Sequence, residues 1–346
     1  MSNKSALFGL TLAQLTDVAA QNGLPRFAAK QMADWLYAKN VASIDEMTNL
    51  AKNNRAKLAE NYEVGRREPL EVATSADGTK KYLFAASKGF IETAYIPDED
   101  RHTLCVSSQV GCKMNCQFCM TGKQGFQANL TANEILNQLA SIDEREQMTN
   151  MVFMGMGEPL DNIDEVMRAI EILTAPWGYG WSPRRITLST IGVTSQLKRV
   201  LDSTDVHIAV SMHNANPLER EEMMPAQKAF PIAKTVEILR GYDWTGQRRL
   251  TFEYTMFSGW NDTPRHVDEI TRLLAGMNCR VNLIHFNSFP NSTLKGSSQQ
   301  AMERFRDLLN RRGFVATIRR SRGQDIQAAC GLLSTQKQID NSNQHP

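Results

Sequence analysis

Between residues 101 and 333, short apolar runs alternate with segments whose apolar residues recur every three or four positions. The runs are TLCVSS, MVFMG, RITLST, VHIAVSM, LTFEYTMF, VNLIHFN and FVATIRR, and typical intervening segments are TANEILNQLASI and IDEVMRAIEILT. Strands that alternate with helices predict a parallel sheet whose crossover connections are helical. Six such units favour an α/β fold with a partial parallel (βα)6 barrel over a closed eight-fold barrel.

The first hundred residues follow other patterns. Helical periodicity covers 10–62, where Thr11 can cap the first helix, whereas KKYLFAA and FIETAYIP indicate a β-hairpin. The last residues are polar and without periodicity, which is typical of disorder. We therefore predict a small all-α accessory domain over 1–67, a β-hairpin adaptor over 68–100, the barrel over 101–333 and a disordered tail over 334–346.

Composition places the chain among soluble enzymes. Of 346 residues, 42% are apolar, which is enough for one large core, and the net charge of +2 does not by itself indicate a nucleic-acid binder. No run approaches the roughly 18 apolar residues of a spanning helix. The start, MSNKSALFGLTLAQL, lacks the apolar run and the cleavage site of a signal peptide. We expect a cytoplasmic protein that does not bind membranes.

Local basic clusters change this picture, because several arginines occur in pairs that could meet phosphates if the fold gathers them. Solvated helix ends and turns are the alternative interpretation. The pairs are Arg66-Arg67, Arg184-Arg185, Arg248-Arg249, Arg311-Arg312 and Arg319-Arg320, the last followed by Arg322.

Four of the six cysteines fall within fifteen residues, and in a reducing compartment this spacing favours a metal or catalytic site over structural disulfides. Cys112, Cys116 and Cys119 form a C-x3-C-x2-C loop directly after the first strand of the barrel. Three ligands leave one iron of a four-iron cluster open to a substrate ligand. The alternative is a zinc site with Cys105 as fourth ligand, although Cys105 lies inside a strand-like run.

Two further motifs follow predicted strands. Gly155-Met156-Gly157-Glu158-Pro159 follows MVFM, where glycines let the backbone approach a ligand and the Glu158 carboxylate can pair with an ammonium group. Cys330 lies in GQDIQAACG, on a predicted loop after the last strand, where a lone buried cysteine is the alternative. Cys279, in GMNCRVNL, is interpreted as core.

The cysteine spacing, with Phe118 before the last cysteine, resembles the radical S-adenosylmethionine (SAM) superfamily. The resemblance implies a 4Fe-4S cluster on Cys112, Cys116 and Cys119, which splits SAM reductively to give a 5'-deoxyadenosyl radical. Without it, the serines at strand ends would be turn-capping residues and His213 a packed histidine. The SAM contacts that it implies are Gly157, Glu158, Ser189, Ser211, Met212, His213 and Asn287.

The segments CVSSQVGC, SPRRITLST, KRVL and DIQAACG resemble the RlmN type of RNA adenine C2 methyltransferase over about residues 10 to 333. That resemblance implies methylation of C2 of an adenosine in the peptidyl transferase region of 23S rRNA and of adenosine 37 in tRNAs. Two SAM molecules are used: one methylates Cys330, and the other yields the radical that activates the S-methyl group. Cys105 matches the resolving cysteine, which leaves a transient disulfide. Glu92 matches a proton acceptor, a role that Cys105 could also take.

The expected partners are 23S rRNA, tRNA and a flavodoxin-like electron donor, and the expected state is a monomer. Two alternatives stay open. One is the Cfr type, which modifies C8 of the same rRNA adenosine and against which Val110 and Pro159 count. The other is a zinc-stabilised RNA-binding protein without catalysis. In the helical domain the residues that could follow an RNA backbone are Lys30, Lys52, Arg55, Lys57, Arg66 and Arg67.

Overall fold

The computed structural model describes residues 4–290 and 292–335. The chain divides into two compact units. The first contains Met1–Pro69, Leu130–Gln147 and Ile163–Ser182, and the second contains Leu70–Asn129, Met148–Asn162 and Pro183–Pro346. Each unit is therefore assembled from segments that are distant in sequence.

The first unit is helical, as the amino-terminal periodicity predicts. The Thr11 hydroxyl accepts a hydrogen bond from the Gln14 N–H, and the Gln14 side chain accepts one from the Thr11 N–H, so the expected cap is present. A short pair of parallel strands, β1 (Ser5–Ala6) and β2 (Tyr62–Glu63), closes the segment. Its helices are α1 (Leu12–Gln21), α2 (Ala28–Ala33), a π-helical turn (Asp34–Ala38), α3 (Lys52–Asn61), α5 (Ala132–Ala140) and α6 (Ile163–Thr174).

Two helices that the sequence assigns to the barrel repeats, α5 and α6, belong to this unit by their contacts. The Asn133 side chain donates to the carbonyls of Phe8 and Gly65 at 3.0 and 3.1 Å. The Arg66 guanidinium donates to the carbonyls of Asn40 and Ala140 at 2.7 and 3.0 Å, so it serves the fold of this unit.

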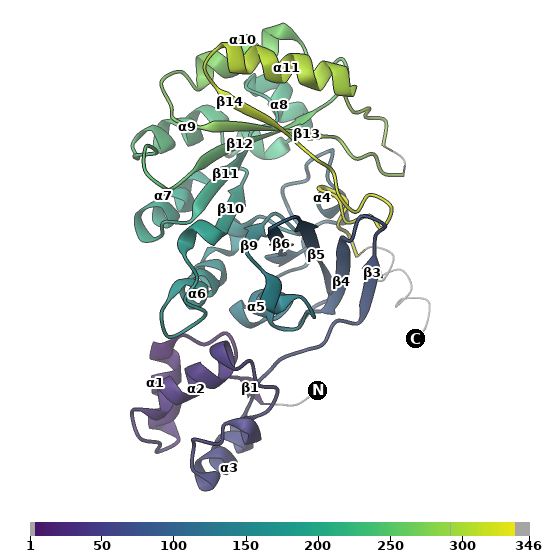
Figure 1. Cartoon of the computed structure of the whole chain (residues 1–346). Coiled ribbons are helices and arrows are strands. Elements are labelled where there is room, and N and C mark those ends of the chain that lie inside the picture. The colour runs from purple at the N-terminus through teal and green to yellow at the C-terminus, as the bar shows by residue number, and fades with distance from the viewer. Residues whose placement is uncertain (1–3, 291, 336–346) are drawn as a thin grey trace. The chain divides into compact units, whose positions relative to one another are not determined.

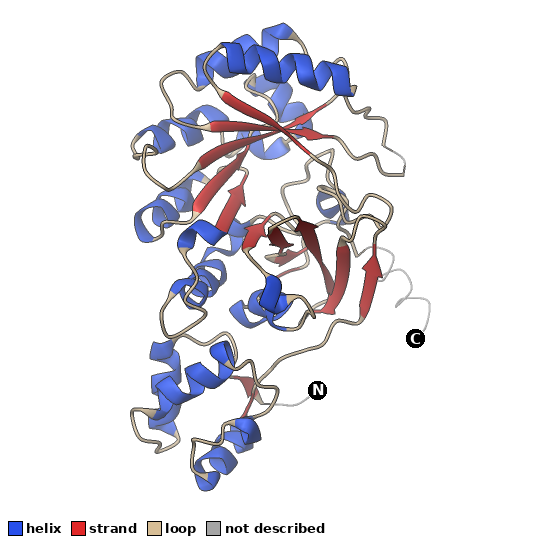
Figure 2. Cartoon of the chain, viewed as in Figure 1, coloured by secondary structure: helices blue, strands red, loops and turns tan. Residues whose placement is uncertain are grey.

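The second unit is built on one ten-stranded sheet with the order β14-β13-β12-β11-β10-β9-β6-β5-β4-β3 (Figures 1 and 2). The seven strands from β6 to β14 are parallel, which confirms the predicted α/β core. They are β6 (Arg101–Cys105), β9 (Asn150–Phe153), β10 (Ile186–Thr190), β11 (His207–Ser211), β12 (Leu250–Met256), β13 (Arg280–His285) and β14 (Val315–Arg319). Among the described residues no pairing joins β14 back to β6, as in a partial barrel.

The predicted hairpin is part of this sheet. β4 (Lys80–Ala85) and β5 (Phe90–Asp98) pair antiparallel, and β3 (Glu71–Thr74) adds a further strand. β5 also pairs antiparallel with β6, whose other edge pairs parallel with β9. The hairpin therefore extends the barrel sheet directly.

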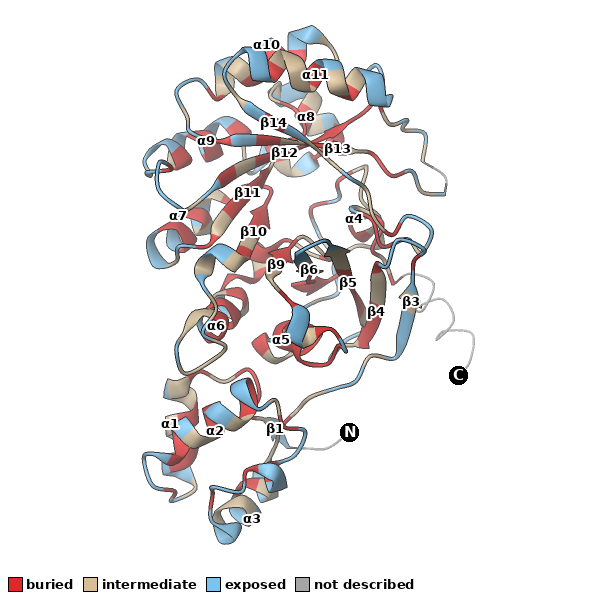
Figure 3. Ribbon diagram, in the orientation of Figure 1, coloured by how far each residue is buried: buried red, intermediate tan, exposed pale blue. Residues whose placement is uncertain are grey.

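Helices connect the later strands and bury their apolar stripes, as the buried positions in Figure 3 show. For example, Phe305 of α11 stacks on Tyr254 of β12 at 5.4 Å between ring centroids. No helix of the described residues is long and apolar enough to cross a membrane. The helices of this unit are α4 (Met120–Gln124), α7 (Thr194–Ser203), α8 (Pro217–Met223), α9 (Ile232–Arg240), α10 (Pro264–Leu273) and α11 (Gln299–Arg311).

The segment after β14 differs from the prediction at its end. Ser334, expected to begin the disordered tail, donates its N–H to Glu92 at 2.9 Å, and the N–H of Thr335 bonds to Gln124 at 3.0 Å. These bonds satisfy backbone groups that the polar composition suggested were free. Residues 336–346 of the predicted tail lie outside the described residues.

Candidate active site

A cavity with about 1190 Å³ of space, open solvent included, lies at the carboxyl ends of the parallel strands and gathers most of the predicted site residues. Met212 and Glu92 are not among its lining residues. Met212 is fully buried, and only its backbone bonds to neighbours. Of the predicted residues, the lining contains Cys105, Cys112, Cys116, Cys119, Gly157, Glu158, Ser189, Ser211, His213, Asn287 and Cys330.

The cysteine loop has a tight backbone conformation. Gly111 has a φ of 71°, and a Cβ there would lie 1.7 Å from the carbonyl oxygen of Gly125, so only glycine fits. Cys112 donates its N–H to the same carbonyl at 3.2 Å, and the Cys119 N–H donates to Cys116 at 3.2 Å. The loop therefore turns all three thiols toward one cavity.

The chemistry of these thiols fits a metal cluster. Burial raises the pKa of Cys112 to about 12, and burial together with the neighbouring thiols raises the pKa of Cys116 well above its usual value. A bound metal would compensate the charge of these thiolates and so favour the anionic form. Three converging thiols with no fourth cysteine on the loop therefore suit a 4Fe-4S cluster with one open iron.

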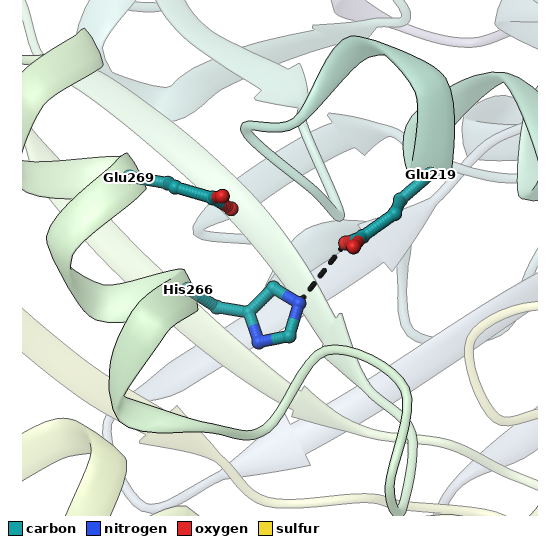
Figure 4. A group of neighbouring side chains, drawn as sticks. All are labelled: Glu219, His266 and Glu269. Carbon is teal, nitrogen blue, oxygen red and sulfur yellow. Dashed lines mark hydrogen bonds and ion pairs between the residues drawn. The ribbon is translucent and has the colours of Figure 1, made fainter.

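The zinc alternative fits poorly. A tetrahedral site with Zn–S bonds of about 2.3 Å brings sulfur atoms to about 3.8 Å from one another. In the described part of the chain, the only three potential ligand side chains whose ligand atoms all lie within 4.8 Å are Glu219, His266 and Glu269 (Figure 4). Arg265 ion-pairs with both of these carboxylates, at 2.5 and 2.7 Å, so this group cross-links α8 and α10. The cysteines do not have zinc spacing.

The glycines after β9 serve close packing of two loops. A Cβ on Gly157, which has a φ of 99°, would lie 2.5 Å from the Gln109 side chain, and one on Gly155 would lie 2.7 Å from the backbone of Val106. This positions Glu158, whose carboxylate accepts bonds from the Thr190 hydroxyl at 2.6 Å and from two backbone N–H groups. Burial raises the pKa of Glu158 to about 7. The carboxylate thus lines the cavity as a fixed hydrogen-bond acceptor.

His213 connects the β11 end to the cysteine loop. Its φ is 54°, and its Nδ1 accepts the Thr255 N–H at 2.9 Å, so this nitrogen carries no proton. Burial lowers its pKa to about 3. The neutral ring meets Phe118 edge-on at 4.7 Å between centroids, which supports the loop between Cys116 and Cys119.

Cys105 and Cys330 are far apart in the sequence but line the same cavity. Cys105 ends β6, is buried, and packs with Ala328, whereas Cys330 is exposed. Burial raises the pKa of Cys105 to about 12. Although Cys330 reaches solvent, the groups packed around its thiol desolvate it and raise its pKa, and the Arg319 guanidinium opposes the shift for both thiols. One arginine therefore favours the thiolate form of both cysteines.

Sequence reasoning missed Arg319, which it treated as part of an ordinary basic pair. It also missed Glu253 of β12, a buried carboxylate that lines the cavity and has one oxygen without a hydrogen-bond partner among the described residues. Strand alternation contained a signal for both, because Thr317 and Arg319 share a face of β14 and Glu253 is a lone charge in an apolar run.

Hydrogen bonds hold the Cys330 segment at several points. The Asn287 side chain donates to the Cys330 carbonyl at 3.2 Å and accepts a bond from Gln324 at 2.6 Å. The N–H of Met120, the residue after Cys119, donates to the Gly331 carbonyl at 2.8 Å. The Cys330 loop and the cysteine loop are therefore directly connected.

Glu92 lies behind this segment. Its carboxylate pairs with Lys81 at 2.9 Å and accepts the Ser334 N–H at 2.9 Å. Burial raises its pKa, and Lys81 acts in the opposite direction. In this structure Glu92 anchors the chain after Cys330.

Comparisons with known proteins identify the family of the chain. A family model described as "Radical SAM superfamily" matches residues 106–274, and one described as "Ribosomal RNA large subunit methyltransferase N-terminal domain" matches residues 5–64. The chain is 56% identical to "Probable dual-specificity RNA methyltransferase RlmN" of Parabacteroides distasonis, over 98% of this chain and 99% of the relative. It is 42% identical to "Dual-specificity RNA methyltransferase RlmN" of Marinobacter nauticus, over 96% and 93% of the two chains.

A solved structure is also similar. The radical SAM methyltransferase from Sphaerobacter thermophilus has a TM-score of 0.89 and 39% identity, covering 95% of this chain and 99% of that one. The superfamily implies a 4Fe-4S cluster and SAM, in agreement with the three converging cysteines. The chain therefore belongs to the RlmN family, within the radical SAM superfamily.

Proposed function

We propose that this protein methylates C2 of adenosine in 23S rRNA, in the peptidyl transferase region, and of adenosine 37 in tRNAs, through an S-methyl group on Cys330. The observation that carries the proposal is that Cys330 and Cys105 line one cavity with the three cysteines of the cluster loop. The names of the relatives, dual-specificity RNA methyltransferases, support RNA as the substrate.

Two thiols suit the chemistry of this carbon. C2 of adenine is electron-poor and has no lone pair to attack a sulfonium methyl group. When bound, the cluster and two SAM molecules supply a methyl group and a radical that can remove a hydrogen atom from it. The Cys330 thiolate accepts the methyl group, and Arg319 favours that thiolate because it opposes the rise of its pKa.

Cys105 completes the cycle. Once the activated methyl carbon of Cys330 has bonded to C2, the adduct carries one unpaired electron, which would return to the oxidised cluster when that group is bound, and a base takes the C2 proton. The Cys105 thiolate then attacks the Cys330 sulfur. The bond from that sulfur to carbon breaks, its electron pair and a proton go to the carbon, and a Cys105–Cys330 disulfide forms. A cellular thiol reductant then reopens the disulfide.

The C2 proton has two candidate acceptors. Glu92 is ion-paired with Lys81 and does not line the cavity, whereas Cys105 lines it. These positions favour Cys105 as the acceptor and Glu92 as an anchor of the segment after Cys330. A Glu92→Gln variant that methylates RNA at the wild-type rate would remove Glu92 from the list of acceptors.

The test is mass spectrometry of nucleosides from unmodified rRNA and tRNA treated with anaerobic, cluster-loaded protein, SAM and a flavodoxin-type reductant. We expect 2-methyladenosine and about four irons per chain. Finding 8-methyladenosine would establish Cfr-type chemistry instead. Zinc in place of iron, with unmethylated RNA, would establish a zinc-stabilised RNA-binding protein.

We further propose that the enzyme acts as a monomer in the cytoplasm.

A further inference from the structure

A second cavity, with about 1300 Å³ of space that includes open solvent, is lined by residues near the amino ends of several strands of the same sheet. Arg101 and Arg280 are the first residues of β6 and β13, and Arg249 directly precedes β12. Thr187 of β10 and Thr251 of β12 contribute hydroxyl groups to its wall. Its lining is thus mostly polar, in contrast to the cavity that holds the cysteines.

Arginines dominate this second cavity. Six of its lining residues are arginines and only two are acidic, Asp98 and Glu253. Asp98 pairs with Arg322 at 2.6 Å, and Glu253 lies near Arg319. In the described part of the chain, the other four guanidinium groups have neither an ion pair nor a hydrogen bond; they belong to Arg101, Arg249, Arg280 and Arg320.

The excess of positive charge in this cavity affects the groups beside it. His207, the first residue of β11, also lines the cavity. Burial and the charges of Arg249 and Arg101 lower the pKa of His207 to about 4. The cavity therefore has a strongly positive potential near neutral pH, and its histidine adds no charge.

The two cavities adjoin and share part of their lining. Both are lined by Ile96, Met154, Glu253 and Arg319. A smaller cavity is lined by Arg320, Arg322 and Cys330. A polymer bound along these adjoining cavities would place one of its units beside the thiols of Cys105 and Cys330.

We propose that this arginine-lined cavity binds the phosphodiester backbone of the RNA next to the target nucleotide. Guanidinium groups match phosphate oxygens with two parallel hydrogen bonds, and four free guanidinium groups exceed what a single small anion needs. The small cavity that Arg320 and Arg322 line together with Cys330 favours a polynucleotide over a free anion, because the flanking phosphates must lie within reach of the flipped base. This inference rests on the proposed function, since it names the site that receives the same RNA.

The test compares two double variants of equal charge. Arg249→Gln/Arg280→Gln removes two free guanidinium groups from the cavity, and Arg304→Gln/Arg311→Gln removes two exposed ones from α11. Binding of an unmodified tRNA transcript is measured against salt concentration with anaerobic cluster-loaded protein, without reductant so that no turnover occurs. SAM binding is measured in parallel as a check on the other cavity.

We expect the cavity variant to bind this transcript at least about tenfold more weakly at 0.15 M salt, and the salt slope to fall by about 1.4, which corresponds to two lost single-strand phosphate contacts. SAM binding by the cavity variant should match that of the wild type, and so should RNA binding by the α11 variant. Arg249→Lys/Arg280→Lys, which keeps the charge, should retain the slope. Unchanged slope and affinity in the cavity variant, or an equal loss in the α11 variant, would overturn the inference. Wild-type protein that makes no methyladenosine would instead refute the proposed function.

Discussion

The Met120 N–H donates a 2.8 Å hydrogen bond to the Gly331 carbonyl, and this bond joins the residue after Cys119 to the residue after Cys330. The segment of Cys330, the proposed methyl acceptor, and the loop predicted to hold the cluster therefore share one backbone contact. Since effective transfer depends on sub-ångström placement of reacting groups, this bond is expected to position Cys330.

Gly331→Ala tests that positioning. Gly331 has a φ of 84°, and a Cβ there would lie 3.2 Å from the Phe118 carbonyl, so alanine shifts the backbone at the bond. We expect methylation of Cys330, followed by mass spectrometry of the protein, to slow at least about tenfold, which corresponds to roughly 1.4 kcal/mol in the barrier. Iron content should stay constant. Gly276→Ala is the control, because Gly276 has a φ of 76° and open space around it.

The two reacting thiols should give different phenotypes. Cys330→Ala should abolish methylation of RNA, since no residue then accepts the methyl group. Cys105→Ala should accumulate a covalent protein–RNA species, visible as a shifted band that resists denaturation. Cys279→Ala, which changes a buried cysteine outside the cavity, is the matched control. Normal turnover by either of the first two variants would refute the two-thiol mechanism.

Arg319→Gln should shift the pH dependence of Cys330 methylation. The positive charge of Arg319 favours the thiolate, so its loss raises the thiol pKa. Each unit of increase lowers the thiolate fraction about tenfold at pH below that pKa. Methylation rates measured from pH 7 to 9 should therefore show an alkaline displacement, which Arg319→Lys largely reverses. A uniform loss of rate at every pH would indicate a structural role only.

His207 should make the protein less stable in acid. Its pKa is about 4 in the folded protein against a usual 6.5, so between these values the unfolded chain binds more protons. The free energy of unfolding should therefore decrease as pH falls from 6.5 toward 4, by at most about 3 kcal/mol from this residue. His207→Gln should flatten that decrease in anaerobic denaturant titrations and leave stability at pH 7.5 nearly unchanged. An identical slope in both proteins would contradict the assignment.

Much of this molecule could be predicted from local pattern. Apolar runs such as those that became β10 and β12 are buried on both faces in a parallel sheet, so their composition reveals them. The convergence of Cys105 and Cys330 could not be predicted from periodicity, because it depends on how β6 and the segment after β14 meet across the sheet. Only the family resemblance predicted that these two cysteines act together.

The pairing of basic residues was the least informative pattern. Arg66 and Arg248 donate to backbone carbonyls, Arg319 faces the thiols, and Arg249 lines the arginine cavity. Adjacent residues of a strand or turn point to different sides, so the two arginines of a consecutive pair have different surroundings. Only the register of the sheet distinguishes them.

The end of β6 has a consequence for how turnover is divided between the two thiols. Cys105 is paired on both edges, with Ala94 of β5 and with Val152 of β9, so the sheet fixes its Cα. A disulfide requires Cα atoms about 4.4–6.8 Å apart. In the proposed cycle, any movement between the dithiol and disulfide forms must therefore come from the Cys330 segment. The protease sensitivity of that segment should then differ between reduced and oxidised enzyme, while the sheet stays the same.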